Sequence, residues 1–571
     1  GELSASSTKQ KGDINYPPQA FYEIGAYHDK DENNPAQGMV HEVRVYRRVL
    51  SPDEILSHHR GKTLQSPPIS ELAAGPYLQF TSPKEAIVRW ETKEPSPTTL
   101  TYGLDDAMRT IQSKTLTTTH QATLTNLKRH RLYTYSIETG RDGKTMSTQQ
   151  FECDTFFNYQ LLPEPPAQAA AASGIDRILA TPFGQRGLAF VVGCDDGSLV
   201  EKLARESRLN VVAFSTNPKT VARVRTRLQA KQLYGSRASV LLVESLAALP
   251  TTRSCANLVT APGSVAATFG ADEFAEIQRV VRPNGITSLS FPLGKAADRW
   301  KSWLTASSLT FKATDRKEQT TVETVQPPLS GTGDWSHLYG SPDNSAFGGE
   351  TLQDVSSTED LVVQWIGRPG PRYQPDRNGR KPSPLSVNGR LFLQGLQRLV
   401  ALDAYNGTGL WSLEIPELGR FNMPRDCGNW SADENYVYVA INDRLWQIDA
   451  QTGTVVHQHQ VPSGTNEEWS YDWGYIANIG SSIFGSTVKA GTSFKSFWGG
   501  SSDGWYDAKS GKATAKVCSE QLFCLKKSDW SQRWLYRGGL ILNSTITATE
   551  KTVYFVETRH PKLLGAADRR I

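Results

Sequence analysis

In this 571-residue chain, two glycines that flank an aspartate form a short pattern of the kind that binds a cofactor. Residues 190–204 read FVVGCDDGSLVEKLA, an apolar run, then a turn with Gly193 and Gly197, then a helix-forming stretch. A glycine-rich turn between a strand and a helix lets a nucleotide-like cofactor approach the backbone at the helix N-terminus. Asp195 stands between the glycines, so a carboxylate occupies a place where such a cofactor needs bare backbone.

Two further positions would complete a cofactor site of this kind. A carboxylate at the end of the second strand accepts hydrogen bonds from ribose hydroxyls. Here that strand, NVVAFS, ends in Ser215, and Glu244 follows the third strand, ASVLLV. The candidate cofactor-binding residues are Gly193, Asp195, Gly197, Ser215 and Glu244.

Residues 172–315 must position these side chains, and there helical stretches alternate with apolar strands. The strands read LAFVVG, NVVAFS, ASVLLV, ANLVTA and GITSLSF. This alternation is typical of βαβ units and predicts an α/β, Rossmann-like domain with a parallel, doubly wound sheet.

The segment resembles a class I S-adenosylmethionine (SAM)-dependent methyltransferase over its whole length. In that family the turn is usually Gly-x-Gly-x-Gly and the second strand ends in Asp or Glu. Gly193 and Gly197 match this pattern, whereas Asp195 and Ser215 depart from it. Glu244 matches the acidic residue that family members place near the adenine.

The loop after the fourth strand, NLVTAPGSV, contains no Asn-Pro-Pro-Tyr-type motif, no cysteine and no general base, so the catalytic residues are unknown. Losing one polar ligand contact costs roughly 1 to 3 kcal/mol, and burying an unpaired like charge costs more. We therefore expect a vestigial SAM site in an inactive domain. A SAM-dependent methyltransferase that tolerates Asp195 is the alternative.

A repeated turn marks residues 328–571. The segments ALDAYNGTGLW, QIDAQTGTVVH and WYDAKSGKATA share an Asp-Ala-x-x-Gly core, with Asp403, Asp449 and Asp507 spaced 46 and then 58 residues apart. A tight hairpin needs an Asx-type hydrogen bond and a residue that tolerates positive φ, which explains the Asp and the Gly. This period predicts a β-propeller with about four blades in this chain, an incomplete ring.

These units resemble pyrroloquinoline-quinone-like (PQQ-like) propeller repeats, whose blades end in a tryptophan-docking motif. Trp411 keeps the aromatic residue, while His457 and Ala515 hold the equivalent places. A PQQ-dependent oxidoreductase, completed by blades beyond residue 571, is a further alternative. Such enzymes commonly carry an adjacent-cysteine disulfide, and no Cys-Cys pair occurs here. The turns alone favour a binding platform.

The N-terminal residues carry β-type patterns. Residues 73–156 show short alternating strands that predict a β-sandwich. They resemble a fibronectin-III-like domain of the type that precedes purple acid phosphatases, with Trp90 and a tyrosine corner at Tyr133. Residues 1–62 resemble the last strands of a laminin-G-like, concanavalin-type jelly roll. Because a jelly roll needs about eight strands, we expect the chain to be part of a longer polypeptide.

Composition narrows the function classes. A net charge of +4 gives no strong attraction to nucleic acid, and no apolar run is long enough to span a membrane. The six cysteines form no CxxC pair, so we expect no metal site, while Cys518 and Cys524 fit either a small disulfide loop or two free thiols.

The domain order resembles that of large multidomain proteins of planctomycete-type bacteria, which are inferred to be exported. We therefore expect an extracytoplasmic binding or assembly protein of the cell envelope. Its partners would be other envelope proteins, further segments of the same polypeptide, or glycans. No cofactor is expected, with SAM and PQQ as the two alternatives.

Overall fold

The computed structural model describes residues 26–28, 33–35 and 72–571, except 105–106, 142–143, 158–160, 162–185, 317, 353–354, 368–381, 396, 420–425 and 494–514. The chain divides into two compact units, Gly1–Ser70 and Glu71–Ile571. In the first unit, β1 (Ala26–His28) pairs antiparallel with β2 (Asn33–Pro35). The other residues of the predicted jelly-roll ending lie outside the described residues.

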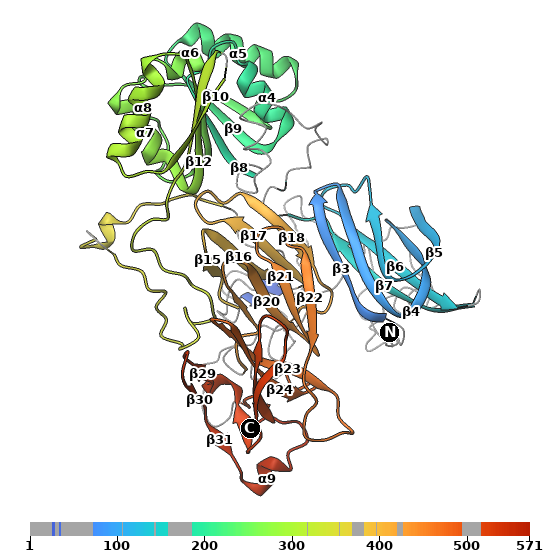
Figure 1. The fold of residues 1–571 in the computed structure, drawn as a ribbon. Helices are drawn as coiled ribbons and strands as arrows, with labels where there is room; N and C mark the ends of the chain where they lie inside the picture. Colours follow the sequence, from blue (N-terminus) through green and yellow to red (C-terminus); the bar gives the residue numbers. More distant parts are fainter. Residues whose placement is uncertain are drawn as a thin grey trace. The chain divides into compact units, whose positions relative to one another are not determined.

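Five antiparallel strands begin the second unit (Figure 1). Trp90 is buried and stacks on His120, and the hydroxyl of Tyr133 accepts a hydrogen bond from the amide of Lys128 at 2.7 Å, as a tyrosine corner would. All five strands join one connected sheet, so the two-sheet sandwich stays a prediction. The strands are β3 (Leu72–Ser82), β4 (Glu85–Leu104), β5 (Ala107–Leu124), β6 (Leu132–Arg141) and β7 (Lys144–Asp154).

A seven-stranded α/β sheet follows, with the order β10-β9-β8-β11-β12-β14-β13. The first five strands in this order are parallel, as predicted, and β14 runs antiparallel to both of its neighbours. The sheet also extends past residue 315, where the predicted segment ended, because β14 returns beside β12. The strands are β8 (Arg186–Val192), β9 (Arg208–Ser215), β10 (Ala238–Leu242), β11 (Ala256–Ala261), β12 (Val281–Pro292), β13 (Phe311–Asp315) and β14 (Gln319–Val325).

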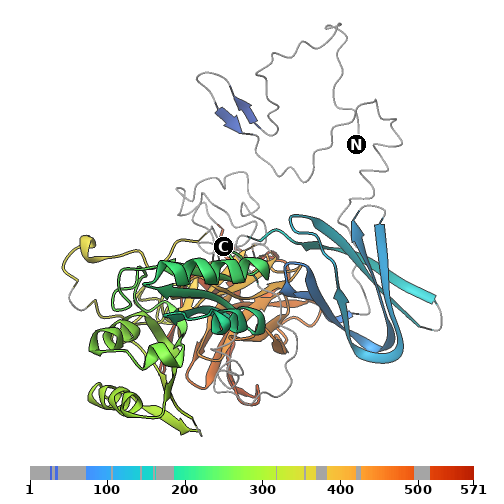
Figure 2. The same ribbon diagram turned by 90° about the horizontal axis from the view of Figure 1, so that it is seen from above.

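Helices cover both faces of this sheet (Figures 1 and 2). Successive residues of β8 enter different cores, because side chains of a strand alternate between its faces. Ala189 and Val191 pack with α4 and α5, whereas Phe190 and Val192 pack with α7 and α8. The helices are α4 (Ser198–Glu206), α5 (Pro218–Ala230), α6 (Gly263–Ala266), α7 (Ala271–Val280) and α8 (Lys295–Ala306).

Three antiparallel meanders of four strands make up most of the remaining chain. We call them the first, second and third blade. The first is β15 (Leu385–Val387), β16 (Arg390–Gly395), β17 (Arg398–Asp403) and β18 (Gly409–Glu414). The second is β19 (Trp430–Ala432), β20 (Tyr436–Ile441), β21 (Arg444–Asp449) and β22 (Val455–Gln460). The third is β23 (Tyr471–Ile479), β24 (Ser482–Lys489), β26 (Gln521–Lys526) and β27 (Gln532–Tyr536).

Shorter elements complete the C-terminal part. Strands β25 (Cys518–Ser519), β28 (Leu540–Leu542) and β31 (Glu557–Thr558) form a small sheet, and β29 (Thr547–Ala548) pairs with β30 (Val553–Tyr554). The helical turns are η1 (Thr358–Asp360), η4 (Asn543–Thr545) and α9 (Pro561–Leu564).

The two described copies of the repeated turn have the geometry that the sequence predicts. Asp403 accepts a hydrogen bond from the amide of Tyr405 at 2.9 Å, and Asp449 accepts one from the amide of Gln451 at 3.0 Å. Gly407 and Gly453 adopt φ values of 71° and 72°. Asp507, in the third copy, lies outside the described residues.

A tryptophan bonds to each of the two described turns of the repeat. The indole N–H of Trp411, in the first blade, donates to the carbonyl of Ala450 in the turn of the second blade at 3.0 Å. Trp365 makes the same bond to the carbonyl of Ala404 in the first blade's turn at 2.9 Å. His457 stacks on Trp530 instead, at 5.2 Å between ring centroids. The described residues form no closed ring, so the propeller stays a prediction.

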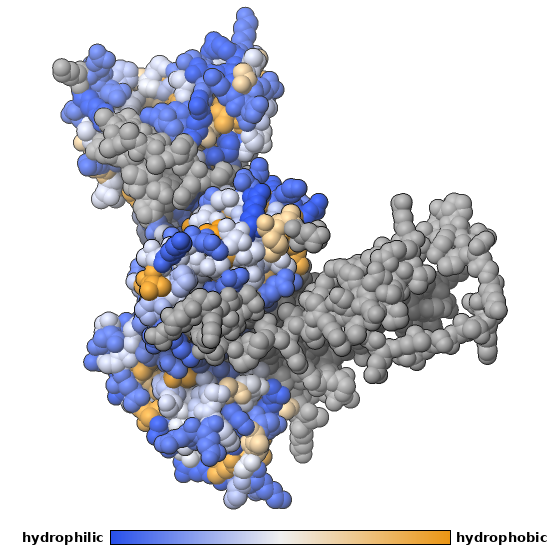
Figure 3. All heavy atoms as spheres, turned by 90° about the vertical axis from the view of Figure 1, so that its right-hand side faces the viewer, coloured by the Kyte–Doolittle hydropathy of each residue, from blue (hydrophilic) through white to orange (hydrophobic). Residues whose placement is uncertain are grey.

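The surface and the cysteines add further findings. Hydrophilic residues cover most of the described surface on the face in Figure 3, with hydrophobic residues in small groups. No helix in the described part of the chain has the length and hydropathy that a membrane crossing requires. All six cysteines are buried free thiols, including Cys518 and Cys524, and within the described ranges no three acidic, His or Cys side chains gather as metal ligands would.

Candidate cofactor site

The strand order of the α/β sheet reverses at β8. Strands β9 and β10 lie on one side of β8, and β11 and β12 lie on the other. In open α/β sheets, a ligand binds outside the carboxyl ends of the strands at such a reversal. We call residues 193–197 after β8 and 261–265 after β11 the switch-point edge, and this edge is the candidate cofactor site.

Both glycines of the turn pack closely against other parts of the same domain. Their φ values are +78° at Gly193 and +83° at Gly197, a conformation that L side chains rarely adopt. A Cβ atom at Gly193 would lie 2.4 Å from Cγ1 of Val265, and one at Gly197 would lie 2.8 Å from Cγ1 of Val224. Val265, from α6, therefore lies directly on the first glycine of the turn.

Asp195 lies at the surface of the turn. Its carboxylate accepts a hydrogen bond from the amide of Asp196 at 2.7 Å, and its backbone carbonyl accepts one from the guanidinium of Arg223 at 2.7 Å. The side chain thus folds back onto its own loop, and its negative charge remains at the mouth of the candidate site.

Asp196 occupies the start of α4. Its Oδ1 accepts hydrogen bonds from the amide of Ser198 at 3.0 Å and from the Ser198 hydroxyl at 2.7 Å. These bonds, together with nearby Arg227, lower the pKa of Asp196 to about 2, so this carboxylate is ionised at neutral pH. Arg227 also donates to Glu201 at 2.8 Å, which holds α4 against α5. The first amide of α4 is therefore bonded to the chain itself.

Ser215 is buried at the end of β9, where the sequence predicts a ribose-binding position. Its hydroxyl accepts a hydrogen bond from the amide of Asn217 at 3.2 Å, and it also interacts with the thiol of Cys194. Burial raises the pKa of that thiol. Asn217 in turn caps α5 through the amides of Lys219 and Thr220. Ser215 thus serves the local strand-to-helix turn.

The structure brings the predicted residues to one edge of the sheet. Strand β10 pairs with β9, so that Leu242 lies opposite Ser215, and Glu244 is exposed two residues further on. Gly193 follows β8, which is the next strand on the other side of β9. The spatial grouping agrees with a cofactor edge, while the occupant stays a prediction.

Comparisons with known proteins bear on this domain. The protein family described as "Methyltransferase domain" matches residues 190–289. This part of the chain is a methyltransferase-like domain. No curated protein matches the chain.

Solved structures similar to the chain align over about a quarter of it. A SAM-dependent methyltransferase from Aquifex aeolicus aligns at 13% identity over 27% of this chain and 89% of that one, with a TM-score of 0.23. A TehB-like SAM-dependent methyltransferase from Corynebacterium glutamicum aligns at 14% identity over 27% and 85%, with a TM-score of 0.22. The [4+2]-cyclase SpnF aligns at 14% identity over 27% and 81%, with a TM-score of 0.24.

A hollow of about 520 Å³ lies beside the switch-point edge of the methyltransferase-like domain. Gly263 and Ser264 of α6 contribute to it, together with the end of β12 and the turn between β13 and β14. Arg316 and Glu318 in that turn are both exposed.

Three residues that determine the geometry of the switch-point edge were not identified from the sequence: Asp196, Arg227 and Val265. The Asp-Gly-Ser spacing at residues 196–198 is a local signal, because an Asp often accepts a hydrogen bond from an amide two residues later. The contacts of Arg227 with Asp196 and of Val265 with Gly193 join distant parts of the chain. No local pattern reveals them.

Proposed function

We propose that this chain is an exported binding or assembly protein in which the methyltransferase-like domain is a non-catalytic scaffold. One observation carries the proposal: side chains of the chain itself occupy the switch-point edge. Val265 lies on Gly193, and Asp196 is bonded to the first amide of α4. A SAM molecule would have to displace such contacts before it could approach the turn.

The charge at this edge also opposes the carboxylate of SAM, although the ammonium and sulfonium groups of SAM are cationic. Asp196 is ionised at neutral pH, and the methionine part of SAM carries a carboxylate of its own. Two like charges about 4 Å apart repel by about 1 kcal/mol in water and by about 4 kcal/mol at an effective dielectric constant of 20. Arg227 lies 3.4 Å from Asp196 and offsets part of this repulsion.

The ribose side of the edge lacks a matching acceptor. Ser215 has a hydroxyl in place of a carboxylate, and this hydroxyl is buried and already accepts a hydrogen bond from the amide of Asn217. Each hydrogen bond to a charged group contributes about 1.5 to 3 kcal/mol. The loss of this acceptor therefore weakens the site further.

The blades supply the binding platform in this proposal. The indole of Trp411 in the first blade bonds to the turn of the second blade, and a propeller-like array requires contacts of this kind between neighbouring blades. We infer that its partners are envelope proteins, other segments of the same polypeptide or glycans, outside the cytoplasm. Fractionation of cells that produce the full polypeptide tests the location, and recovery in the cytosol would refute it.

An active SAM-dependent methyltransferase is the second candidate, which the match to residues 190–289 favours. The grouping of Gly193, Ser215 and Glu244 along one edge favours it as well. Asp195 does not adopt a positive φ, so the side chain at this position causes no backbone strain in the turn.

Isothermal titration calorimetry with SAM separates the two candidates. The scaffold proposal predicts no binding heat up to millimolar SAM in the wild-type chain. The double variant Asp195→Gly, Ser215→Asp should gain at most weak binding, because Asp196 and Val265 remain in place. Micromolar binding by the wild type that Gly193→Arg abolishes would refute the scaffold proposal.

A further inference from the structure

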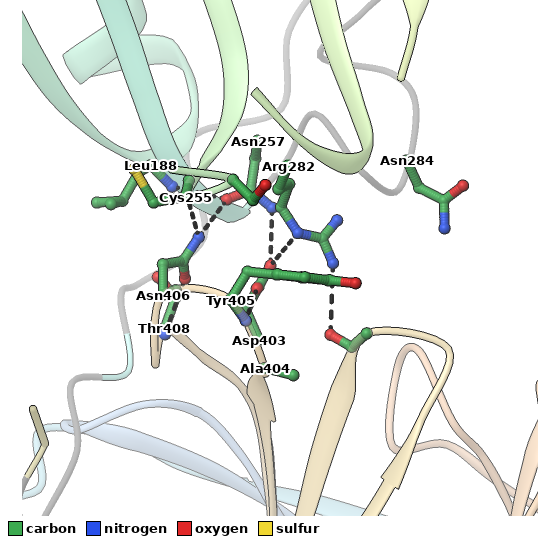
Figure 4. Close-up of polar contacts among 12 residues, drawn as sticks. Leu188, Cys255, Asn257, Arg282, Asn284, Asp403, Ala404, Tyr405, Asn406 and Thr408 are labelled. Carbon is green, nitrogen blue, oxygen red and sulfur yellow. Dashed lines mark hydrogen bonds and ion pairs between the residues drawn. The ribbon is translucent and has the colours of Figure 1, made fainter. Parts of the chain in front are cut away.

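A buried polar network joins the methyltransferase-like domain to the turn of the first blade (Figure 4). Asn257 in β11 donates from Nδ2 to Oδ2 of Asp403 at 2.9 Å. Its Oδ1 accepts from the amide of Leu188 at 2.9 Å and from Nδ2 of Asn406 at 2.7 Å. Asn406 also donates to the carbonyl of Cys255 at 2.8 Å. One amide side chain thus connects β8, β11 and the blade turn.

Arg282 in β12 adds a buried ion pair to the same turn. Its Nε lies 3.1 Å from Oδ2 of Asp403, and the two side chains are only 4% and 2% exposed. The guanidinium also lies over the ring of Tyr405, 5.0 Å from its centroid. Breaking a buried pair of this kind leaves an uncompensated charge, which is strongly destabilising. The contact therefore depends on both partners.

Comparison with the corresponding turn of the second blade shows which side-chain contacts are particular to the first turn. Asp449 accepts the amide two residues later, as Asp403 does, and it also accepts the amide of Thr452, but it is only partly buried. Thr452 stands where the first turn has Asn406, and its hydroxyl bonds to Asp449 and to Thr454. Turn formation alone therefore requires neither the buried Asp403 pair nor Asn406.

The other end of the same hairpin contacts the β3–β7 domain. Arg398 in β17 pairs with Glu414 in β18, and it also donates to the backbone carbonyls of Asp154 and Phe156. The Glu414 carboxylate accepts a hydrogen bond from the amide of Asp154 at 3.3 Å, and β18 pairs with β3 through Leu413 and Glu414. The hairpin Arg398–Glu414 therefore contacts one neighbouring domain at each end.

We infer that the amino-end edge of the methyltransferase-like sheet is a docking surface for the Asp403–Asn406 turn. Through the Arg398–Glu414 hairpin, the methyltransferase-like domain, the first blade and the β3–β7 domain unfold together. The inference goes beyond the proposed function, since it concerns the edge opposite the candidate cofactor site. It holds whether or not that site binds a ligand.

Hydrogen exchange measured by mass spectrometry on the full chain tests this inference. The variant Asp403→Asn keeps a side-chain acceptor for the turn and removes the charge that pairs with Arg282. We expect amide exchange in β8 and β11 to become at least tenfold faster. Asn406→Thr introduces the residue that the second turn has at this place, and it should accelerate amide exchange in β8 and β11 by a smaller factor. It replaces Asp403→Asn as the test variant if Asp403→Asn fails to fold.

Asp449→Asn is the matched control, because it makes the same chemical change in a turn that bonds to Gln79 of β3 and to Trp411 rather than to the methyltransferase-like domain. It should leave exchange in β8 and β11 within twofold of the wild type. Unchanged exchange of these strands in both Asp403→Asn and Asn406→Thr would overturn the inference. Equal acceleration by Asp449→Asn would overturn it as well. None of these variants lies at the switch-point edge, so the result is separate from the outcome of the SAM titration.

Discussion

At the scale of single residues, His337 is a buried group whose charge state follows from its contacts. Its Nε2 accepts a hydrogen bond from the amide of Asn478 at 3.2 Å, and its Nδ1 lies 2.8 Å from the hydroxyl of Ser336. Burial and, to a smaller degree, the charge of Lys527 lower its pKa to about 3. The folded chain therefore keeps this imidazole neutral.

This depressed pKa predicts loss of stability in acid. The unfolded chain takes up a proton at this histidine below about pH 6.5, whereas the folded chain does not. The stabilisation is complete above that pH and is lost as the pH falls towards 3, by up to about 1.4 kcal/mol per pH unit. Urea unfolding of wild type and His337→Gln between pH 7 and pH 4 measures it. The exposed His560→Gln is the control, and equal slopes in all three proteins would contradict the prediction.

Glu414 titrates in the opposite sense. Burial raises its pKa to about 7, and although Arg398 works against the shift, Asp154 adds to it. Since the folded chain binds this proton more tightly, stability falls as the pH rises from about 4.5 to about 7 and is then constant. Glu414→Gln should remove this decrease, whereas Glu468→Gln on the surface should keep it. Urea midpoints at pH 5, 6 and 8 give the comparison, and an unchanged decrease in Glu414→Gln would rule this assignment out.

Local chemistry determined which residues could be interpreted from sequence alone. The glycines at 193 and 197 and the Asp-Gly turns at 403–407 and 449–453 act through their own backbone, so their roles were predictable. The partners of Asp403 were not, because Asn257 and Arg282 lie more than a hundred residues away in the chain. The same motif thus forms a turn that contacts β3 in one blade and a turn that contacts the methyltransferase-like domain in another.

At the scale of elements, the docked tryptophans make a prediction about the blades. Trp411→Phe keeps most of the packed ring and removes the N–H that donates to the carbonyl of Ala450. A buried carbonyl left without its donor costs about 1 to 3 kcal/mol. The urea midpoint should fall for Trp411→Phe and stay nearly constant for Trp534→Phe, whose ring is partly exposed. A midpoint unchanged by Trp411→Phe would show that the bond contributes nothing.

The periodicity of the chain predicted the parallel part of the α/β sheet, since β8 to β12 contain apolar runs and helices separate all of them except β10 and β11. The antiparallel hairpin β13–β14 escaped prediction because its residues, such as Lys312 and Glu323, are largely polar. The pairing between β18 and β3 could not be predicted either, since the sequence of an edge strand does not indicate which strand will pair with it.

At the scale of the whole molecule, the second unit places a methyltransferase-like domain and a series of blades on a shared hairpin. The domain's switch-point edge carries its own aspartates and an apolar side chain, and its opposite edge carries the buried contacts to the first blade. The buried contacts to the first blade therefore lie at the edge away from the candidate cofactor site. The proposed scaffold role requires contacts of this kind.

A crystal structure of the chain grown with saturating SAM distinguishes a scaffold from a SAM-binding domain. In a scaffold, Val265 remains on Gly193, Asp196 remains bonded to the amide of Ser198, and no nucleoside density lies along residues 193–197. A sulfonium nucleoside bound there, with its ribose hydroxyls held by groups beside Ser215, would refute the scaffold proposal.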